Sequence, residues 1–415
     1  MRFPTILLAC AALLAHGAAG ACAPGLYREP GGSAQVVLTR PAERLRYTFT
    51  DGRRGEVGAG DSPLRCAGAR LAGRDDPATA WIPVPLDRTE SAFDSHGTRL
   101  HGVLVEPAGA PATAPLVVFV HGSERTSPMD SAYPFILASF GLRVFAYDKR
   151  GTGRSEGEYT QNFELLADDA AAAFAEARRL AAGRHGSIGY FGGSQGGWVA
   201  PLAATRSPAD FVAVGFGLMA SPIEEDRDQV LLELRERGAD AKVLAAAREV
   251  TEATATLVRS HFTEGFEALA EVRRRHGGQP WFRSIRGEYT GGILAMPEAD
   301  LRRVGRALYD NLELIWDYNA MAALSRVRAR QLWILAEEDR EAPVAVTLDR
   351  LSRLREEGAK IAVYSFPGTD HGMVEFTEGA DGSRSYGRIT DGYFRLLADW
   401  ISGRMSGPYG RVRER

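Results

Sequence analysis

Residues 187–204, with the sequence SIGYFGGSQGGWVAPLAA, constrain the fold of this chain more than any other stretch. The apolar run at residues 188–191 is typical of a buried strand. A glycine-rich turn follows it, and the next apolar segment indicates the start of a helix. A strand, a G-x-S-x-G turn and a helix in this order predict that the Ser194 hydroxyl is exposed above the sheet edge. Gly192 and Gly196 suit this turn, because a Cβ there would collide with the neighbouring strand or helix. The alternative is a glycine-rich loop with an incidental serine.

A serine hydroxyl is a weak nucleophile that needs a base, and the base needs an orienting acid. In chains with this kind of turn, the acid and then the histidine follow the serine. Of the eight histidines, only His371 comes after the last predicted strand. Three consecutive acids follow the predicted strand at residues 331–336. Among them we predict Asp339 as the orienting acid, with Glu338 as the alternative; the remaining interpretation is a solvated acidic loop.

Attack of a serine on a carbonyl also needs N–H groups that stabilise the developing oxyanion. We predict the backbone N–H of Gln195, the residue after the serine, as one donor. The second donor is predicted to be the N–H of Ser123, in the loop after the apolar run at residues 116–120. Gly122 allows this loop to turn, and His121 is expected to support the loop rather than to take part in the chemistry.

Strand-like and helix-like segments alternate through most of the chain. Continuous apolar runs predict buried strands at residues 116–120, 142–147, 187–191, 211–216, 331–336 and 361–366. Helices are predicted at residues 131–140, 163–180, 348–357 and 386–401, and a hairpin at residues 89–93 and 100–106. This order predicts the α/β class, with a mostly parallel, doubly wound sheet and right-handed crossovers.

Three further segments surround this core, which we assign to residues 88–222 and 331–402. Residues 223–330 are too long for an ordinary crossover, and their helical spacing predicts a cap inserted over the carboxyl ends of the strands. Residues 22–87 contain short strands and turn residues, which predict a small β-rich N-terminal domain. Residues 403–415 are rich in Gly and Arg and are expected to be a loose tail.

Residues 1–21 predict a signal peptide, since a positive start and an apolar run precede an A-x-A cleavage site. The alternative is an N-terminal helix of the mature fold. Cleavage leaves Cys22 and Cys66, and two cysteines in an exported protein predict one disulfide. Two free thiols or a lipid anchor on Cys22 are the alternatives. We therefore expect a periplasmic or secreted protein.

Composition excludes several classes of function. The net charge of −3 over 415 residues gives no electrostatic reason to expect a nucleic-acid partner. After the N-terminus no apolar run is long enough for a membrane span. The glycine-rich loop at residues 151–157 does not fit G-x-G-x-x-G, and no clustered metal-binding motif stands out. We therefore expect neither a cofactor nor a metal, and the sequence does not predict the oligomeric state.

Taken together, five features resemble the α/β-hydrolase superfamily over residues 89–401. They are the His121–Gly122 loop, the loop at residues 148–155, the serine turn, the acidic turn and His371. The glutamine after the serine resembles acetyl-esterase and prolyl-oligopeptidase-like branches, whereas Ala336 departs from the glycine that the family usually has. The resemblance implies an exported serine hydrolase that cleaves carboxylic esters through an acyl-enzyme, with Ser194 as nucleophile, His371 as base and Asp339 as orienting acid.

Two alternatives stay open: a peptidase or amidase of the same fold, and a non-catalytic binding protein on this fold. Aminopeptidases of this fold resemble one another in gripping the substrate's ammonium group with cap carboxylates. Glu224, Glu225 and Asp226 stand where the cap begins. We interpret them as the acidic first turn of a helix, where negative charge suits the helix dipole. Small esters are therefore favoured over short peptides as substrates.

Overall fold

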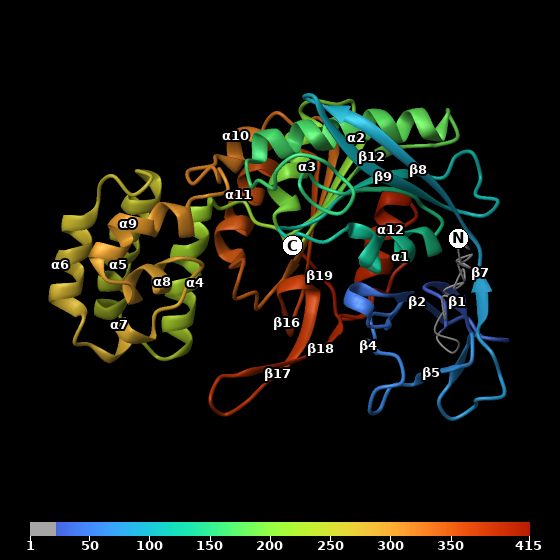
Figure 1. Cartoon of the computed structure of the whole chain (residues 1–415), viewed down its shortest axis with the longest axis horizontal. Helices are drawn as coiled ribbons and strands as arrows, with labels where there is room; N and C mark the ends of the chain where they lie inside the picture. The colour runs from blue at the N-terminus through green and yellow to red at the C-terminus, as the bar shows by residue number, and fades with distance from the viewer. Residues whose placement is uncertain (1–21) are drawn as a thin grey trace, which may run out of the picture.

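The computed structural model describes residues 22–415, and a nine-stranded sheet forms its centre (Figure 1). The predicted signal peptide, residues 1–21, lies outside the described residues. In spatial order the strands are β19 (Arg413–Glu414), β15 (Ile361–Phe366), β14 (Arg330–Ala336), β13 (Phe211–Gly215), β12 (Ile188–Gly193), β10 (Leu116–Val120), β11 (Arg143–Tyr147), β9 (Thr98–Pro107) and β8 (Leu86–Ser95). The strands from β15 to β11 pair in parallel, whereas β19, β9 and β8 pair antiparallel at the two edges. The predicted mostly parallel sheet is confirmed.

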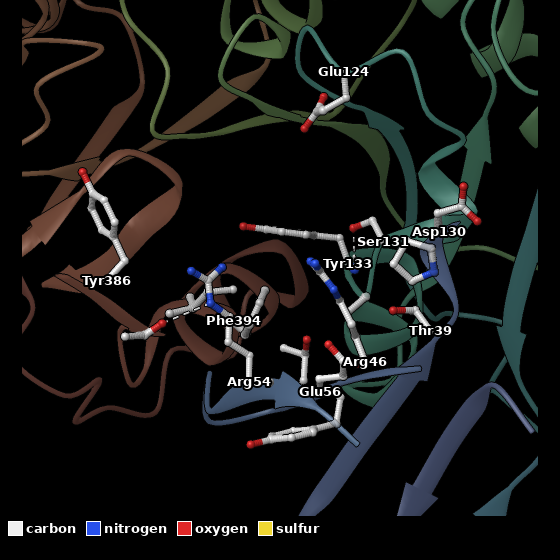
Figure 2. A pocket seen from close by; sticks show the side chains of 17 residues that line it. Thr39, Arg46, Arg54, Glu56, Glu124, Asp130, Ser131, Tyr133, Tyr386 and Phe394 are labelled. Atoms are coloured by element: carbon white, nitrogen blue, oxygen red, sulfur yellow. Dashed lines mark hydrogen bonds between the residues drawn. The ribbon is translucent and has the colours of Figure 1, made fainter. Parts of the chain in front are cut away.

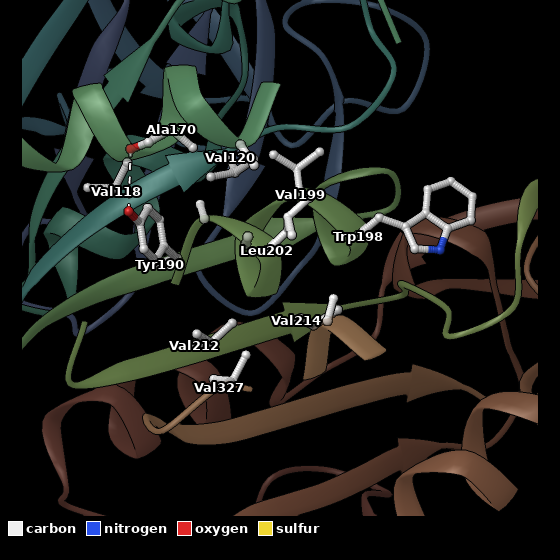
Figure 3. Close-up of a cluster of buried hydrophobic side chains, with 14 of the residues drawn as sticks. Val118, Val120, Ala170, Tyr190, Trp198, Val199, Leu202, Val212, Val214 and Val327 are labelled. Carbon is white, nitrogen blue, oxygen red and sulfur yellow. Dashed lines mark hydrogen bonds between the residues drawn. The ribbon is translucent and has the colours of Figure 1, made fainter. Parts of the chain in front are cut away.

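Helices cover both faces of this sheet. On one face lie α2 (Phe163–Ala181), α3 (Gly196–Ala204), α10 (Ala320–Leu324) and α11 (Val344–Glu356), and on the other lie α1 (Tyr133–Ser139) and α12 (Tyr393–Ser402). Figure 3 shows part of the first face, where Val199 and Leu202 of α3 join the same core as Val212 of β13. Every residue of β10, β11, β12 and β13 is buried, so these strands need apolar side chains on both faces.

The chain between β13 and β14 forms the helical cap, which Figure 1 shows at the left of the sheet. It contains α4 (Pro222–Glu236), α5 (Ala241–Arg259), α6 (Phe266–His276), α7 (Pro280–Ser284), α8 (Thr290–Ala295) and α9 (Glu298–Tyr309). The cap has its own apolar core, in which Val250, Leu257 and Leu301 are fully buried. Across residues 22–415, none of the helices combines the length and the apolarity that crossing a bilayer requires.

The N-terminal segment forms a five-stranded antiparallel sheet at the other end of the molecule (Figure 1). Its strands, in spatial order, are β4 (Arg54–Glu56), β3 (Arg46–Phe49), β2 (Gln35–Thr39), β1 (Gly25–Arg28) and β7 (Ile82–Val84). A hairpin of β5 (Leu64–Ala67) and β6 (Arg70–Gly73) accompanies it, and Cys22 and Cys66 form a disulfide that closes this region. Leu26 and Val37 belong to the same apolar core as α1 and α12, so the small sheet packs on the central one.

The structure differs from the sequence prediction after β15. The helix predicted over residues 386–401 begins only at Tyr393, because Gly392 has a φ of 85° and precedes the first helical residue. The preceding residues form β18 (Arg384–Ile389), which pairs with β17 (Val374–Glu378), and β17 pairs with β16 (Thr369–Asp370). This small sheet was not predicted.

Residues 403–415 also differ from the predicted loose tail. They end in β19, which pairs with β15, and the Arg415 N–H donates to the Val363 carbonyl over 2.9 Å. Tyr409 is buried, and its hydroxyl donates to an Asp399 carboxylate oxygen over 3.0 Å. The segment is therefore held by strand pairing and by the buried Tyr409. Its Gly- and Arg-rich composition did not indicate either contact.

Candidate active site

The turn between β12 and α3 places Ser194 at the carboxyl end of the central sheet. Ser194 has a φ of 52°, a left-handed conformation that a non-glycine residue adopts at a cost in backbone energy. A Cβ on Gly192 would lie 2.1 Å from the Gly196 carbonyl oxygen, and a Cβ on Gly196 would lie 2.2 Å from the Val120 carbonyl oxygen. Neither position has room for a side chain, so both glycines are needed for the turn.

Three of the sequence-predicted side chains meet at this turn. The His371 Nε2 lies 3.0 Å from the Ser194 Oγ, and its Nδ1 lies 3.0 Å and 3.2 Å from the two carboxylate oxygens of Asp339. Asp339 is buried and also accepts a hydrogen bond from the Ala342 N–H over 2.7 Å. The runner-up acid, Glu338, instead accepts hydrogen bonds from two backbone N–H groups of the loop after β15. Asp339 is therefore the one of the two that orients the imidazole.

The unpredicted β16–β18 sheet fixes the backbone that carries His371. Asp370 is buried, and one of its oxygens accepts hydrogen bonds from the N–H groups of His371 and Arg340, over 2.8 Å and 2.9 Å. Its other oxygen accepts from the Tyr386 hydroxyl and pairs with Arg384, both on β18. The loop that presents the imidazole is therefore held from two directions by one carboxylate.

Local charges control the protonation of His371. Burial opposes the charged imidazolium, but the charge and hydrogen bond of Asp339, with Glu341 and Asp370, outweigh it and raise the His371 pKa to about 9. Burial also raises the Asp339 pKa, against the opposing effect of His371. These charges therefore favour the protonated form of His371 near neutral pH.

The two predicted oxyanion donors lie beside the serine. Ser123 and Gln195 line the same cavity as Ser194, and a Cβ on Gly122 would lie 3.2 Å from the Ser194 Cβ. Within residues 22–415, the backbone N–H groups of Ser123 and Gln195 donate to no other protein group. Both remain available to an oxygen bound next to Ser194.

Buried polar groups support the loop that carries Ser123. The Lys149 ammonium donates to the Gly122 carbonyl, and the Tyr159 hydroxyl donates to the Ser123 carbonyl over 2.6 Å. His121 is buried beside Glu124, with 3.6 Å between ring nitrogen and carboxylate oxygen, and so supports the loop. Burial lowers the Lys149 pKa to about 8. The loop at residues 148–155 contains Lys149, and the sequence alone predicted no role for this lysine.

A cavity of about 250 Å³ lies between the serine turn and the cap; we call it the cap-side pocket. Apolar side chains such as Trp198, Leu218 and Trp316 form part of its wall. Three carboxylates also line it, and they come from separate segments: Glu225 from α4, Glu288 from the loop before α8, and Glu341 from the turn after β14. Glu341 Oε1 lies 3.3 Å from His371 Nε2. The pocket therefore combines an apolar wall with a cluster of acids at the reacting serine.

The acids at the start of the cap differ from one another. Glu224 agrees with the predicted helix-start interpretation: it forms a capping box with Ser221 and pairs with Arg350. Glu225 also lies in the first helical turn, as predicted, but its side chain in addition lines the pocket that contains Ser194. Three adjacent residues on a helix point in three directions, and only the tertiary structure shows which one faces the cavity.

Asp226, the third of these acids, organises the segment that carries Glu288. It is buried, and its carboxylate accepts hydrogen bonds from the Tyr289 and Thr290 N–H groups, over 2.9 Å and 3.0 Å, and from the Thr290 hydroxyl. Gly287 has a φ of 70°, and a Cβ there would lie 2.5 Å from an Asp226 oxygen. A buried carboxylate thus fixes the turn that aims Glu288 into the pocket. Neither Glu288 nor Glu341 was a predicted site residue. Both are far from Ser194 in the sequence, and no sequence pattern indicated that they lie near it.

Burial and neighbouring acids raise the pKa values of the three pocket carboxylates. Burial, together with the charges of Glu341 and Asp226, raises the Glu288 pKa to about 7. Burial and the neighbouring acids raise the Glu225 pKa well above its usual range, and burial raises that of Glu341. Within residues 22–415, neither Glu225 nor Glu288 has a basic group within ion-pair distance. A bound cation would relieve this repulsion.

Known proteins share this architecture. A family model described as serine aminopeptidase, S33, an α/β-hydrolase family, matches residues 111–254. Among solved structures, proline iminopeptidase of Mycobacterium smegmatis is 18% identical, with a TM-score of 0.44 over 76% of this chain and 98% of that chain. An esterase of Pyrococcus furiosus is 14% identical, with a TM-score of 0.43 over 69% of this chain and 83% of that chain. Acylaminoacyl peptidase of Pyrococcus horikoshii is 15% identical, with a TM-score of 0.46 over 91% of this chain and 55% of that chain. No curated protein sequence matches the chain.

Proposed function

Since this chain belongs to the α/β-hydrolase superfamily, we propose that it is a serine hydrolase in which Ser194 attacks a substrate carbonyl carbon. His371 takes the proton from the Ser194 hydroxyl through Nε2, and Asp339 holds the imidazole by its Nδ1–H. The tetrahedral oxyanion accepts hydrogen bonds from the N–H groups of Ser123 and Gln195. His371 then protonates the leaving group, and a water molecule, activated by the same imidazole, hydrolyses the acyl-enzyme.

We propose that the acyl part of the substrate carries an ammonium group. The observation that carries this proposal is the cluster of Glu225, Glu288 and Glu341 beside Ser194. Carboxylates that line one cavity and repel one another bind a cation favourably, because the cation stabilises their charged forms. A free α-amino group, on the carbon next to the scissile carbonyl, has this charge near neutral pH. The substrate class is therefore a peptide or aminoacyl derivative with a free N-terminus.

The carboxylic ester that the sequence favoured is the second candidate. The apolar wall of the cap-side pocket, with Trp198, Leu218 and Trp316, suits the acyl group of a neutral ester. Both candidates use the same serine, so they differ only in what the carboxylates contribute. In the described part of the chain, a neutral acyl group would leave Glu225 and Glu288 without a cationic partner, which is why the aminoacyl substrate comes first.

The nucleophile is tested by labelling the full chain with a fluorophosphonate. Wild-type protein should be labelled and Ser194→Ala should not, while its melting temperature stays close to that of the wild type. Labelling of the variant at another serine would show that Ser194 is not the nucleophile. No labelling of either protein would favour the non-catalytic binding protein.

The substrate is tested with three chromogenic compounds: an aminoacyl p-nitroanilide, its N-acetylated form and p-nitrophenyl acetate. We expect kcat/KM for the free-amine anilide to exceed that for the acetylated anilide by about 100-fold, as for loss of a desolvated ion pair. Equal values for the two anilides, with faster turnover of the ester, would establish the second candidate instead.

We further propose that the protein acts outside the cytoplasm, as the predicted signal peptide implies. The Cys22–Cys66 disulfide supports this, because such bonds persist in oxidising compartments. Cell fractionation followed by intact-mass analysis is the test. We expect a mature chain that begins at Cys22 and carries one disulfide; a retained N-terminus or a lipid on Cys22 would contradict this.

A further inference from the structure

A second large cavity lies between the N-terminal sheet and the central sheet (Figure 2). Its volume is about 750 Å³, and we call it the vestibule. Residues of β3 and β4 line it on one side, Tyr133 of α1 and Phe394 of α12 on another, and Tyr386 of β18 on a third. The N-terminal sheet therefore forms a wall of this cavity in addition to packing on the core.

Two arginines enter the vestibule from the N-terminal sheet. Arg46 lies opposite Glu56, and Arg54 lies opposite Thr48, in the antiparallel pair of β3 and β4. Cross-strand partners share a face, and residues two apart on a strand do as well, so both arginines lie on the same face of the sheet. Figure 2 shows both guanidinium groups pointing toward Tyr133.

Neither guanidinium has a carboxylate partner. Within residues 22–415, no carboxylate lies within ion-pair distance of Arg46 or Arg54, although Glu56 is the cross-strand neighbour of Arg46. The Arg54 Nε donates to the Gly387 carbonyl over 3.1 Å, which leaves its two terminal nitrogens without a partner among the described residues. Burial and the nearby charge of Arg46 lower the Arg54 pKa. Two facing cations without a counter-charge form a site for an anion.

The acids of the vestibule do not neutralise this pair. Glu124 lies across the cavity from the arginines in Figure 2, and its carboxylate is 3.6 Å from the His121 ring. Asp130 belongs to the turn before α1 and is directed away from the arginines in the same view. Arg46, Arg54 and Glu56 line the end of the vestibule that the N-terminal sheet forms, so both of its positive charges stand at that end beside one carboxylate.

A smaller cavity of about 80 Å³ lies next to the vestibule and is lined by Gly193, the residue before Ser194. It shares Glu124, Ser131 and Tyr133 with the vestibule and extends to Gly122 and Phe216. A Cβ on Gly122 would lie 3.2 Å from the Ser194 Cβ, and the Phe216 ring centroid is 5.2 Å from that of His371. This cavity shares no lining residue with the cap-side pocket. The small cavity therefore comes close to the serine turn but is separate from the pocket that Ser194 lines.

We propose that Arg46 and Arg54 bind the C-terminal carboxylate of a short peptide substrate. This inference rests on the proposed function: the N-terminal ammonium group occupies the cap-side pocket, the scissile carbonyl lies at Ser194, and the leaving part extends through the small cavity into the vestibule. Hydrolysis breaks one C–N bond. His371 protonates the leaving amine, water supplies the hydroxyl of the new acid, and the released fragment keeps its carboxylate on the arginines. The N-terminal domain then selects short peptides with free carboxyl ends.

The test compares a tetrapeptide with a free C-terminal carboxylate and the same peptide as its C-terminal amide. Binding is measured by calorimetry on full-length Ser194→Ala, which cannot turn the peptides over under the proposed function. We expect the acid to bind about tenfold more tightly than the amide, as for a partly desolvated carboxylate–guanidinium pair. In Ser194→Ala that also carries Arg46→Gln and Arg54→Gln, the acid and the amide should bind equally. An unchanged ratio, or no preference in Ser194→Ala itself, overturns the proposal.

Two further variants keep the test decisive. The Arg46 side chain makes no hydrogen bond to another group in the described part of the chain. Arg46→Gln alone should therefore fold, and it should lower the acid-to-amide ratio of binding affinities. Arg28 is an exposed arginine of the same sheet that does not line the vestibule, and Arg28→Gln should keep the ratio. The ratio comes from binding measurements, so it tests the carboxylate site in the vestibule independently of turnover. If the ratio behaves as expected but wild-type protein cleaves neither peptide, the proposed function fails and the anion site stands.

Discussion

The cap-side pocket and the vestibule are lined by different charged groups and are built in different ways. The carboxylates of the cap-side pocket are held by buried groups: Asp226 fixes the turn of Glu288 by three hydrogen bonds. The arginines of the vestibule stand on β3 and on the edge strand β4. Their position depends on contacts between β4 and β18, such as that of Arg54 with Gly387. The first pocket is preorganised by the cap, whereas the second exists only while the N-terminal sheet is docked.

The proposed catalytic residues serve every substrate, so their loss should lower kcat more than any other change. It should lower kcat equally for peptides and for esters. We expect Asp339→Asn to lower kcat about 10⁴-fold for peptides and esters alike, because the imidazole loses the partner that fixes its tautomer. Glu338→Gln is the matched control and should lower kcat less than about tenfold, since this side chain caps backbone N–H groups away from His371. Steady-state kinetics on both variants is the measurement. A mild Asp339→Asn beside a severe Glu338→Gln would mean that the acid has been misassigned.

Removing one carboxylate of the cap-side pocket should affect the two substrates differently. We expect Glu288→Gln to lower kcat/KM for the aminoacyl p-nitroanilide about 100-fold, since the substrate ammonium loses a desolvated counter-charge. Turnover of p-nitrophenyl acetate should change less than about threefold, because this ester has no cationic group. Glu224→Gln is the control, as Glu224 pairs with Arg350 outside the pocket. Equal losses for anilide and ester would indicate that Glu288 acts on the catalytic groups and not on the substrate amine.

The pH dependence should differ between the same two substrates. His371 must be neutral to act as base, and its pKa is raised to about 9, so kcat/KM for p-nitrophenyl acetate should rise with pH up to that value. Glu288, with a pKa of about 7, gains its charge above that pH and then favours the ammonium substrate. The α-amino group of the substrate loses its proton near pH 8, so the anilide profile should bend downward above about pH 8. Profiles measured from pH 6 to 10 are the test, and parallel profiles would contradict a bound ammonium group.

Loss of the disulfide should affect the vestibule side alone. In Cys22→Ser with Cys66→Ser, the unfolded chain is no longer constrained, and the N-terminal domain should lose about 4 kcal/mol in its free energy of unfolding. Denaturant unfolding followed in the N-terminal domain measures this loss. Where that domain has unfolded, the preference for free-acid over amidated peptides should disappear, while turnover of p-nitrophenyl acetate changes less than about threefold. A preserved preference after the domain unfolds would place the carboxylate site elsewhere.

Local patterns sufficed to predict the central sheet and the three residues, Ser194, Asp339 and His371, that the structure brings together. The G-x-S-x-G turn needs glycines at 192 and 196 for steric reasons that involve only the adjacent strand and helix. The order of serine, acid and histidine along the chain follows from the order of the parallel strands, which the apolar runs show. The local pattern gave wrong predictions where distant contacts decide the conformation. Residues 384–389 form a strand because β17 pairs with them. The C-terminal segment is ordered because its last residues pair with β15.

The sequence by itself determined the α/β sheet, the strained turn of Ser194 and the neighbourhood of His371, since buried strands and tight turns depend on residues close in the chain. Only the tertiary structure decided what surrounds the serine. Glu225, Glu288 and Glu341 come from three segments, and their common pocket arises from the packing of the cap on the sheet. Arg46 and Arg54 face a cavity because the N-terminal sheet docks beside β18. A carboxylate or an arginine in a sequence is most often a solvated surface group; that like charges from distant segments line one cavity is a property of the packed molecule.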